Sequence, residues 1–396
     1  MALELPYNLR REVVALFAAS FLIFARLDVC AADPDPANGT VELGFSERFY
    51  KAYADEWGKS APPADPNAPA VVSHRPLPFP PAPETAPPYP FTEWPYGGAS
   101  AIGASVPNAV DSPFMTALAP TDIGKWLNEE HIQVYGWVNA GFNISTANGA
   151  KDGNYPAAYM YKPDAVELDQ AVVYVERVPD TVQQDHIDWG FRFATSYGEN
   201  NRYTTAYGIA SYQLLKYNDE NVYDFPMVYG EVYIPGVAEG LVVRAGRFVA
   251  VPDIEAQLAP NDYMYSHSMT YAYDNYTNTG IIASLQATKN WLLQLGVTDG
   301  TDTAPWNLKD PGDQPSLTAC ARWNSDNSWH NVYVCANSIN DGTWAIIIFS
   351  GTALRPITSS RIIGTSPSSF GTCIKTTSRK LARPTSGIRL AAPTSS

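Results

Sequence analysis

Polar and apolar residues alternate along much of the chain between residues 131 and 338. In the stretch HIDWGFRFATSYG, Trp189 and Phe193 fall on one parity, and Arg192 and Ser196 fall on the other. A β-strand places alternate side chains on opposite faces, so this stretch has one aromatic face and one polar face. In a soluble sandwich the aromatic face would be buried. In a membrane barrel it would meet lipid, and the polar face would line a wet lumen.

Roughly ten such stretches follow one another with turn residues between them. They begin with HIQVYGWVNAGFNIST and AVELDQAVVYVERVPD, include SHSMTYAYDNY at residues 266–276, and end with SLTACARWNS and NVYVCANS. The pattern predicts no amphipathic helix of more than three turns within residues 125–344. It therefore favours an all-β fold, for which an antiparallel, up-and-down sheet is the simplest topology.

The N-terminal segment, residues 1–31, has the layout of a signal peptide. Arg10 and Arg11 precede the apolar run VVALFAASFLIFA, which extends from Val13 to Ala25, and small residues follow up to Ala31. The run is shorter than the roughly 18 residues that a spanning helix requires, and no later stretch comes near that length. We therefore expect export and cleavage after Ala31. A mature chain of this kind would enter a membrane only as a closed barrel.

Composition divides the rest of the chain. Of the 35 residues in 61–95, 13 are proline, a density that favours extended polyproline II. We expect residues 32–120 to form a periplasmic linker that stays a loop to about residue 120, and residues 121–344 to form the β body.

The net charge is −14, yet residues 345–396 hold seven bases and no acid, which leaves 19 bases against 40 acids in the first 344 residues. So acidic a body would repel phosphates, which excludes nucleic acid as a partner.

Motifs for catalysis or cofactor binding do not occur. The sequence has no GxSxG, HExxH, GxGxxG or P-loop motif, and its His and Cys residues are scattered, so we expect no enzyme, no cofactor and no metal. Glu167 and Asp169 share a strand face and are expected to be lumen charges, although an enzyme built on a small outer-membrane barrel is another hypothesis. Cys320 and Cys335 flank a hairpin, and in an exported protein they are expected to form a disulfide. The alternative is two free thiols on neighbouring strands.

The segment VPDIEAQLAPNDYMYSHS, residues 251–268, interrupts the strands with two prolines and carries three acids. A long loop folded into a barrel would narrow the pore and set its charge selectivity. The acids are Asp253, Glu255 and Asp262. The candidate opposing charges are Arg192, Arg244 and Arg247. An exposed surface loop with solvated carboxylates is the alternative.

Several long segments resemble the OmpL-like β-barrel porin family of Gram-negative bacteria. They are YGWVNAGFNIST, VELDQAVVYVERVPDTVQQDHIDWGFRFATSYG, VAEGLVVRAGRFVAVPDIEAQLAPNDYMYSHSMTY and LQLGVTDGTDTAPW, with EWPYGGASAIG ahead of the body. The resemblance, over about residues 91–344, implies an outer-membrane β-barrel that passes small hydrophilic solutes. Outer-membrane lipid and the barrel assembly machinery would be its partners, and a homotrimer is an assembly that many porins adopt. An exported β-sandwich that binds carbohydrate through its Tyr and Trp residues remains the alternative.

The tail, residues 345–396, departs from the family pattern. It holds 18 Ser or Thr residues, has no Trp or Tyr, and ends in AAPTSS, whereas barrels of this kind usually close with a strand that ends in an aromatic residue. Strand-like aromatic residues are permitted in a shifted reading frame near Trp344, so a frameshift is one hypothesis and a true basic tail is the other. A barrel that lacks its last strands would have two open edges, so we expect an incomplete transmembrane β-barrel.

Overall fold

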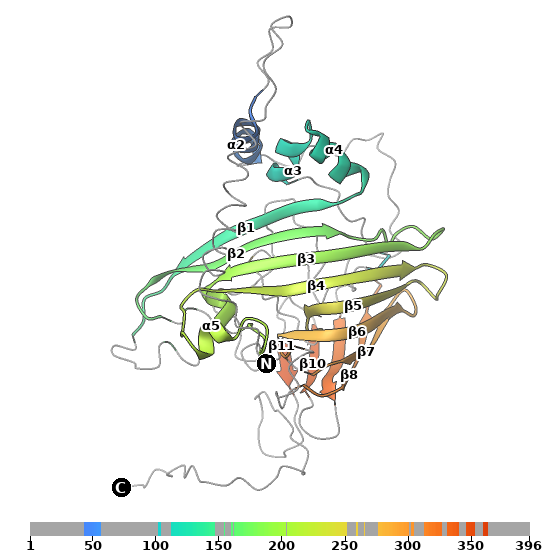
Figure 1. Ribbon diagram of the computed structural model, residues 1–396. Helices are drawn as coiled ribbons and strands as arrows, with labels where there is room; N and C mark the ends of the chain where they lie inside the picture. The colour runs from blue at the N-terminus through green and yellow to red at the C-terminus, as the bar shows by residue number, and fades with distance from the viewer. Residues whose placement is uncertain are drawn as a thin grey trace, which may run out of the picture.

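The β body is one long antiparallel sheet in the computed structural model (Figure 1). The structure describes residues 43–56, 102–103, 112–146, 162–202, 204–251, 276–300, 302–304, 313–326, 331–339, 346–352 and 359–362, with residues 154, 160, 259 and 265. The strands are β1 (Gln133–Phe142), β2 (Val166–Arg177), β3 (Asp188–Gly198), β4 (Val222–Ile234), β5 (Leu241–Val249), β6 (Thr277–Gln286), β7 (Trp291–Thr298), β8 (Ser316–Asn324), β9 (Asn331–Ile339), β10 (Ile346–Thr352) and β11 (Ser359–Ile362).

Each strand pairs with the next strand of the sequence, from β1 to β11. The predicted antiparallel, up-and-down topology is therefore confirmed. Nine of the expected stretches correspond to β1–β9. The stretch at residues 266–276 lies outside the described residues, apart from Tyr276. Strands β10 and β11 extend the sheet into residues 345–396, beyond the body that composition predicts.

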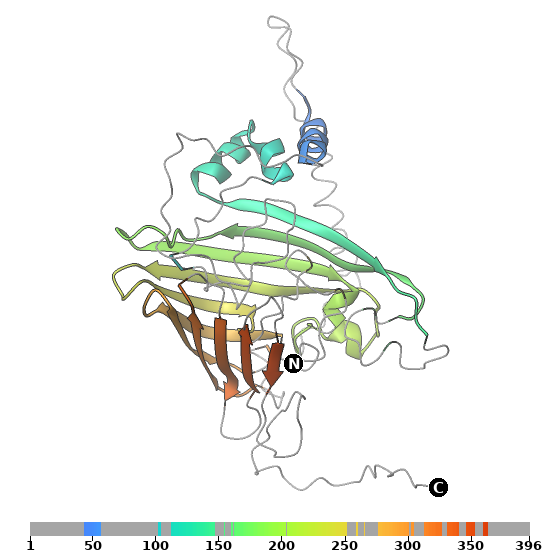
Figure 2. The same ribbon diagram turned by 180° about the vertical axis from the view of Figure 1, so that it is seen from behind.

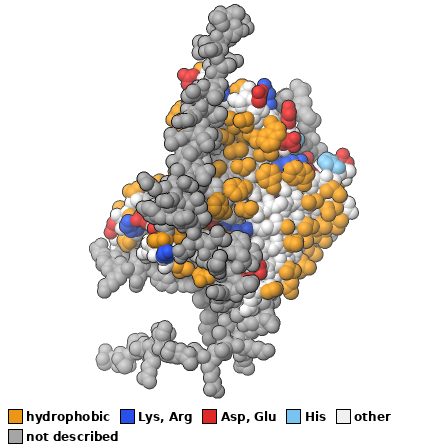
Figure 3. Space-filling view, viewed as in Figure 1, with side chains coloured by type: hydrophobic (Ala, Val, Ile, Leu, Met, Phe, Trp, Pro, Cys, Tyr) orange, Lys and Arg blue, Asp and Glu red, His pale blue; other side chains and the backbone are white. Residues whose placement is uncertain are grey.

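Burial on the two faces of the sheet is the reverse of that in a soluble sandwich. On β3, Trp189 is 51% exposed and Arg192 is 2% exposed, and on β7, Leu295 is 63% exposed and Gln294 is 4% exposed. Strand β7 alternates in this way along its whole length. Figure 3 shows hydrophobic side chains spread widely over the described surface, with few charged groups among them. The apolar face of the sheet is therefore its outer face, and the polar face is its inner face.

From β1 to β9, the two ends of the sheet differ in the length of their connections. At one end, the connections β2–β3, β4–β5, β6–β7 and β8–β9 are short, and they comprise 178–187, 235–240, 287–290 and 325–330. At the other end, β1–β2, β3–β4, β5–β6 and β7–β8 are joined by the longer segments 143–165, 199–221, 250–276 and 299–315. We call these the short-turn end and the long-loop end, and β1 starts at the short-turn end. Short turns at one end and long loops at the other are typical of outer-membrane barrels.

Helices α2 (Phe45–Glu56), α3 (Pro113–Leu118) and α4 (Asp122–Glu129) pack together beside the start of β1 (Figure 1). Ser112 caps α3 by accepting a hydrogen bond from Met115 N, and Thr121 caps α4 by accepting one from Gly124 N. The expectation that the loop continues to about residue 120 is therefore wrong for α3. Pro113 at the first turn of α3 has a φ that suits a helix start, and the Ser cap completes the signal.

The β3–β4 connection contains two further short helices, η2 (Glu199–Arg202) and α5 (Tyr212–Leu215). Of the helices that the structure describes, none is long and apolar enough to cross a membrane.

The sheet curves strongly from β1 round to β11, as Figures 1 and 2 show from opposite sides. Curvature of this kind is needed to close a barrel, because the strands twist and tilt together. Among the described strands, however, β1 and β11 are the two edges and no pairing joins them. The described residues therefore form a curved, open sheet, and closure of the barrel is not seen.

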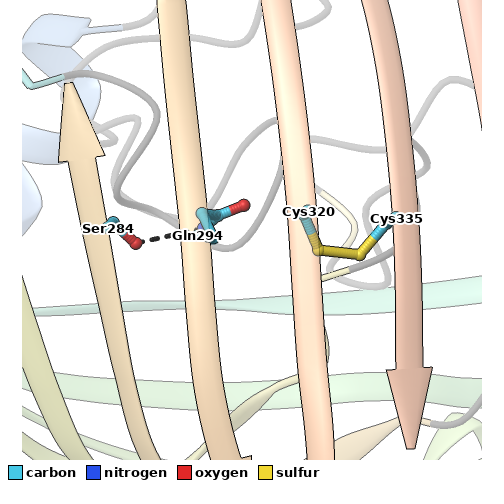
Figure 4. Close-up of a disulfide and its surroundings, with 4 residues drawn as sticks. All are labelled: Ser284, Gln294, Cys320 and Cys335. Carbon is cyan, nitrogen blue, oxygen red and sulfur yellow. Dashed lines mark hydrogen bonds between the residues drawn. A yellow bond between two sulfur atoms is a disulfide. The ribbon is translucent and has the colours of Figure 1, made fainter. Parts of the chain in front are cut away.

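Cys320 and Cys335 lie opposite each other on β8 and β9, with 4.0 Å between their Cα atoms, and a disulfide joins them (Figure 4). They continue a row of register partners in which Gln294 Nε2 donates to Ser284 Oγ at 3.1 Å. Both sulfur-bearing side chains are buried on the inner side. The cross-link therefore holds the register of two strands near the C-terminal edge of the sheet.

We predict that the oxidised protein yields a linked peptide pair containing Cys320 and Cys335 on mass spectrometry without reductant. Replacing both by Ala should lower the free energy of unfolding by about 3 kcal/mol, because a closed loop of this length restricts the unfolded chain. Cys373→Ala is the control and should change neither the peptide pair nor the stability. Labelling of Cys320 and Cys335 by a thiol reagent in the unreduced, unfolded protein would contradict the prediction.

Candidate pore lining and constriction

A row of polar side chains crosses β1 to β4 on the inner face. The register pairs Gln133 with Glu176, Glu176 with Arg192, and Arg192 with Tyr229. Arg192 Nε donates to Glu176 Oε2 at 2.5 Å, and the Tyr135 hydroxyl donates to Glu176 Oε1 at 2.9 Å. Both charged side chains are almost fully buried. Burial of two charges is tolerated here because each one is paired and hydrogen-bonded.

A second ion pair lies beside the first, on β4 and β5. Arg244 donates to Glu231 Oε2 from Nη2 at 2.8 Å and from Nε at 3.0 Å. The guanidinium carbon of Arg244 is 4.0 Å from the ring centroid of Tyr229, and that of Arg192 is 5.8 Å from the same ring. Cations are attracted to the face of an aromatic ring. Tyr229 therefore connects the two ion pairs into one patch.

Arg247 belongs to a separate cluster at the long-loop end. It binds both carboxylate oxygens of Asp224, at 2.9 and 3.0 Å, and donates to Thr277 Oγ1 at 3.3 Å. The Asp302 carboxylate accepts hydrogen bonds from the backbone nitrogens of Tyr276 and Thr277. Burial raises the pKa of Asp302 to about 6, although these backbone donors and Arg247 act in the opposite direction. The cluster ties β4, β5 and β6 to the β7–β8 connection.

The β5–β6 connection reaches across the inner face to β2. Ala259 N donates to Gln170 Oε1 at 3.1 Å, and the Tyr265 hydroxyl donates to Asp169 Oδ1 at 3.2 Å. Two strands, β3 and β4, separate β2 from β5. Asp169 and Gln170 are both buried. These two contacts therefore anchor the β5–β6 connection to β2 on the inner face. Tyr265 and Asp169 are 96 residues apart in the sequence.

Gly141 leaves room for the Tyr265 anchor. A Cβ atom at this position of β1 would lie 1.6 Å from the Tyr265 hydroxyl oxygen and 2.5 Å from Asp169 Oδ2. Burial raises the pKa of the Tyr265 hydroxyl, and nearby carboxyls add to the effect, the largest contribution among them being from Asp169. The phenol therefore stays neutral and acts as a hydrogen-bond donor to Asp169.

The structure places the sequence-predicted charged residues that it describes in three different parts of the inner face. Arg192 and Arg244 lie in one inner patch, and Arg247 lies in the cluster of Asp224. Asp253, Glu255 and Asp262 lie outside the described residues. Glu167 and Asp169 are buried on the inner side of β2, and their role as lumen charges stays a prediction.

Sequence reasoning misses the strand carboxylates that pair with the arginines. They are Glu176, Glu231 and Asp224. The signal for two of them is present in the alternation, because Glu176 shares a parity with Tyr174 in VVYVERV and Glu231 shares one with Tyr229 in MVYGEVY. The pairing itself depends on strand register, which the sequence pattern alone does not give.

No group of three or more His, Cys, Asp or Glu side chains that could hold a metal ion occurs within the part of the chain that the structure describes.

An antiparallel sheet with an apolar outer face, a polar inner face and one short-turn end is typical of the class of β-barrel membrane proteins. The family model "Putative beta-barrel porin-2, OmpL-like" matches residues 131–343, more than half of the chain, and the chain belongs to this family. The resemblance inferred from the sequence is thereby confirmed. Comparison with curated proteins and with solved structures gave no match.

We predict that Glu176→Gln destabilises the folded protein by about 3–5 kcal/mol, because the buried Arg192 charge loses its partner. The double variant Glu176→Leu/Arg192→Leu should recover most of this loss, since it removes both charges. Unfolding by denaturant in detergent micelles measures both. Glu220→Gln is the control, because its ion pair with Lys162 is exposed and should contribute about 1 kcal/mol or less. An equal loss in the single and double variants would contradict the assignment.

Asp302 should make stability depend on pH. Its folded pKa of about 6 lies above its ordinary value of 3.8, so the folded state holds a proton that the unfolded state releases. The contribution is present below about pH 4 and is lost as the pH rises through about 6. Asp302→Asn should therefore lose less stability than the wild type between these values in thermal unfolding. Asp326→Asn, an exposed acid whose pKa is lowered by Asn290 and Lys289, should keep the wild-type loss.

Proposed function

We propose that the protein is an outer-membrane channel for the passive diffusion of small hydrophilic solutes. The observation that carries this proposal is the reversed burial of the sheet, with Trp189, Leu295 and Val138 exposed and Arg192 and Gln294 buried. A water-filled channel needs a polar lumen and an apolar belt, and it needs no catalytic residue. Membership of the porin family agrees with this function.

The reversed burial argues against the alternative of a carbohydrate-binding β-sandwich. In a sandwich, the apolar faces of two sheets pack together and leave the polar faces in water. Here the described strands form a single sheet whose apolar face is exposed. Solutes would pass along the inner face, and lipid would cover the outer face.

The domain organisation that follows has four parts. Residues 1–31 would be a signal peptide for export, 32–120 a periplasmic segment, 121–344 the barrel body, and 345–396 a basic tail outside the family match, which ends at residue 343. In this organisation the short-turn end faces the periplasm, because outer-membrane barrels have short periplasmic turns.

The β5–β6 connection would be the constriction of this channel. Its support is the pair of anchors to β2, Ala259 to Gln170 and Tyr265 to Asp169. Asp253, Glu255 and Asp262 belong to the same connection, between β5 and β6. Because the strand arginines are already paired with Glu176, Glu231 and Asp224, the connection's carboxylates would leave an excess of negative charge at the narrowest point. The channel would therefore prefer cations.

We predict a heat-dependent shift in gel mobility. The outer-membrane fraction of cells that produce the protein should contain a band whose mobility changes on boiling, because a closed barrel resists detergent until it is heated. Single-channel conductance in planar bilayers should follow from the same fraction. Recovery of the protein in the soluble fraction, with no change in gel mobility on boiling, would contradict the channel proposal and favour the β-sandwich. A chain that is only degraded or aggregated would point to a tail that prevents closure.

Leu295→Arg should lower stability in lipid by about 2–4 kcal/mol, because Leu295 lies in the middle of β7 on the lipid-facing side. The matched control is Leu215→Arg on α5, which is also strongly exposed but lies outside the strands. In water an exposed Leu to Arg change has little effect at either site. Denaturant unfolding in vesicles measures the free energy of unfolding of both variants. Equal stabilities would refute a contact between Leu295 and lipid.

Neutralising the acids of the connection with Asp253→Asn/Glu255→Gln should reduce the preference for cations. The reversal potential under a salt gradient measures this change. Tyr265→Phe should raise the conductance, because it removes the hydrogen bond that anchors the connection to Asp169. Asp326→Asn in the β8–β9 turn is the control and should alter neither quantity. An unchanged reversal potential in Asp253→Asn/Glu255→Gln would contradict the proposal that the β5–β6 connection is the constriction.

A further inference from the structure

Helix α4 carries one stripe of apolar side chains, which is buried along one edge and exposed along the other. Leu127 is buried against α2 and α3, whereas Ile123 and Trp126 are 55% and 53% exposed. Gly124 fixes this orientation, since a Cβ atom there would lie 1.9 Å from the carbonyl oxygen of Leu118. Helices α3 and α4 are therefore in close backbone contact. The exposed pair cannot turn inward without breaking that contact.

The helices pack beside the edge of β1 at its start, against side chains of its outer parity. Ile132 and Val134, which share the parity of the exposed Val138 on β1, pack against the cluster that contains Leu127 and Met115. Ile132 N also donates to Leu127 O at 2.8 Å, so β1 follows α4 with almost no linker. Because β1 starts at the short-turn end, α4 and its exposed pair lie at that end of the sheet.

Tryptophan side chains gather on the outer face at the same end. Trp189 starts β3 and is 51% exposed, and Trp291 starts β7 and is 46% exposed. Trp323, near the end of β8, is the register partner of Trp291. Arg177 stacks on Trp189 with its guanidinium carbon 4.6 Å from the ring centroid. Trp and Arg side chains near the ends of spanning segments are typical of the boundary between lipid and water.

We propose that α4 is an interfacial anchor, with Ile123 and Trp126 inserted among the lipid headgroups at the short-turn end. The proposal rests on the proposed function, because it needs the outer face of the sheet to be in lipid. The proposal adds Trp126, on a helix that precedes β1, to the Trp side chains of the strands at the boundary between lipid and water. An amphipathic helix with Trp on its apolar side binds this region of a bilayer.

Lipid is the occupant that the surroundings of α4 favour. The outer face of β1 beyond the residues that the helices cover is apolar, with Val138 71% exposed. A protein partner at Trp126 would have to sit against that same belt. The helix also carries Lys125 and Asp122 as a solvent-exposed ion pair, which gives it a polar side as well.

Quenching of Trp fluorescence by brominated phospholipids tests the proposal. The full-length protein is placed in vesicles whose lipids carry bromine either near the headgroup or deep in the chains. The difference between the wild type and Trp126→Phe isolates the signal of Trp126. We expect it to be quenched several-fold more by the shallow bromines than by the deep ones. Phe is apolar and aromatic, and the side chain is half exposed, so this variant should fold.

Ile123→Cys, labelled with a polarity-sensitive dye, provides a second measurement in a background without Cys30 and Cys373. Its emission should shift to the blue when vesicles are added. Leu215→Cys on α5 is the matched control, because it is an exposed helical leucine on the β3–β4 connection, and its emission should stay unchanged.

The outcomes separate this inference from the proposed function. Quenching of the remaining Trp residues together with that of Trp126 supports both. Quenching of the remaining Trp residues without Trp126 overturns the anchor and leaves the channel standing, and so does a dye on Ile123→Cys that shifts no more than the dye on Leu215→Cys. No quenching of any Trp residue overturns both.

Discussion

The inner face of the sheet depends on cross-strand pairing of opposite charges. Arg192 can be buried only because strand register puts Glu176 directly opposite, and Arg244 only because it puts Glu231 there. Each pair in turn requires the apolar side chains of both strands to point outward, since the side-chain period is two. A shift of one residue between β2 and β3 would bury Trp189 and Phe193 and expose the charges. The ion pairs therefore fix both the register and the reversed burial of the sheet.

The parts of the fold that follow from local alternation can be predicted from the sequence. The faces of β3 and β7 are set by residues such as Trp189 and Leu295, whose parity is visible in a single stretch. The partners of the arginines depend on register between strands, so Glu176, Glu231 and Asp224 do not stand out. Helix α3 escapes the pattern because it has only 6 residues and lies after a long Pro-rich segment, where the Ser112–Pro113 start signal is the sole indication.

The family implies a closed barrel, whereas the described strands form an open sheet. In lipid, a free strand edge leaves backbone groups without partners, which makes an open sheet unstable there. On the β1 side, Ser112 Oγ donates to Val134 O at 2.9 Å, and the helices pack beside that edge. On the other side, β10 and β11 lie in the tail whose composition departs from that of the body. The family match, residues 131–343, covers the strands whose faces alternate most clearly.

Gly141 gives the inner face a size control that involves no charge. The hydroxyl group of Tyr265 occupies the space that a side chain at Gly141 would fill, so an alanine there would displace the anchor of the β5–β6 connection. If that connection is the proposed constriction, exchanges between glycine and alanine on β1 would change the opening while every ion pair of the inner face stays in place. Aperture and electrostatics would then evolve as independent properties of the same barrel.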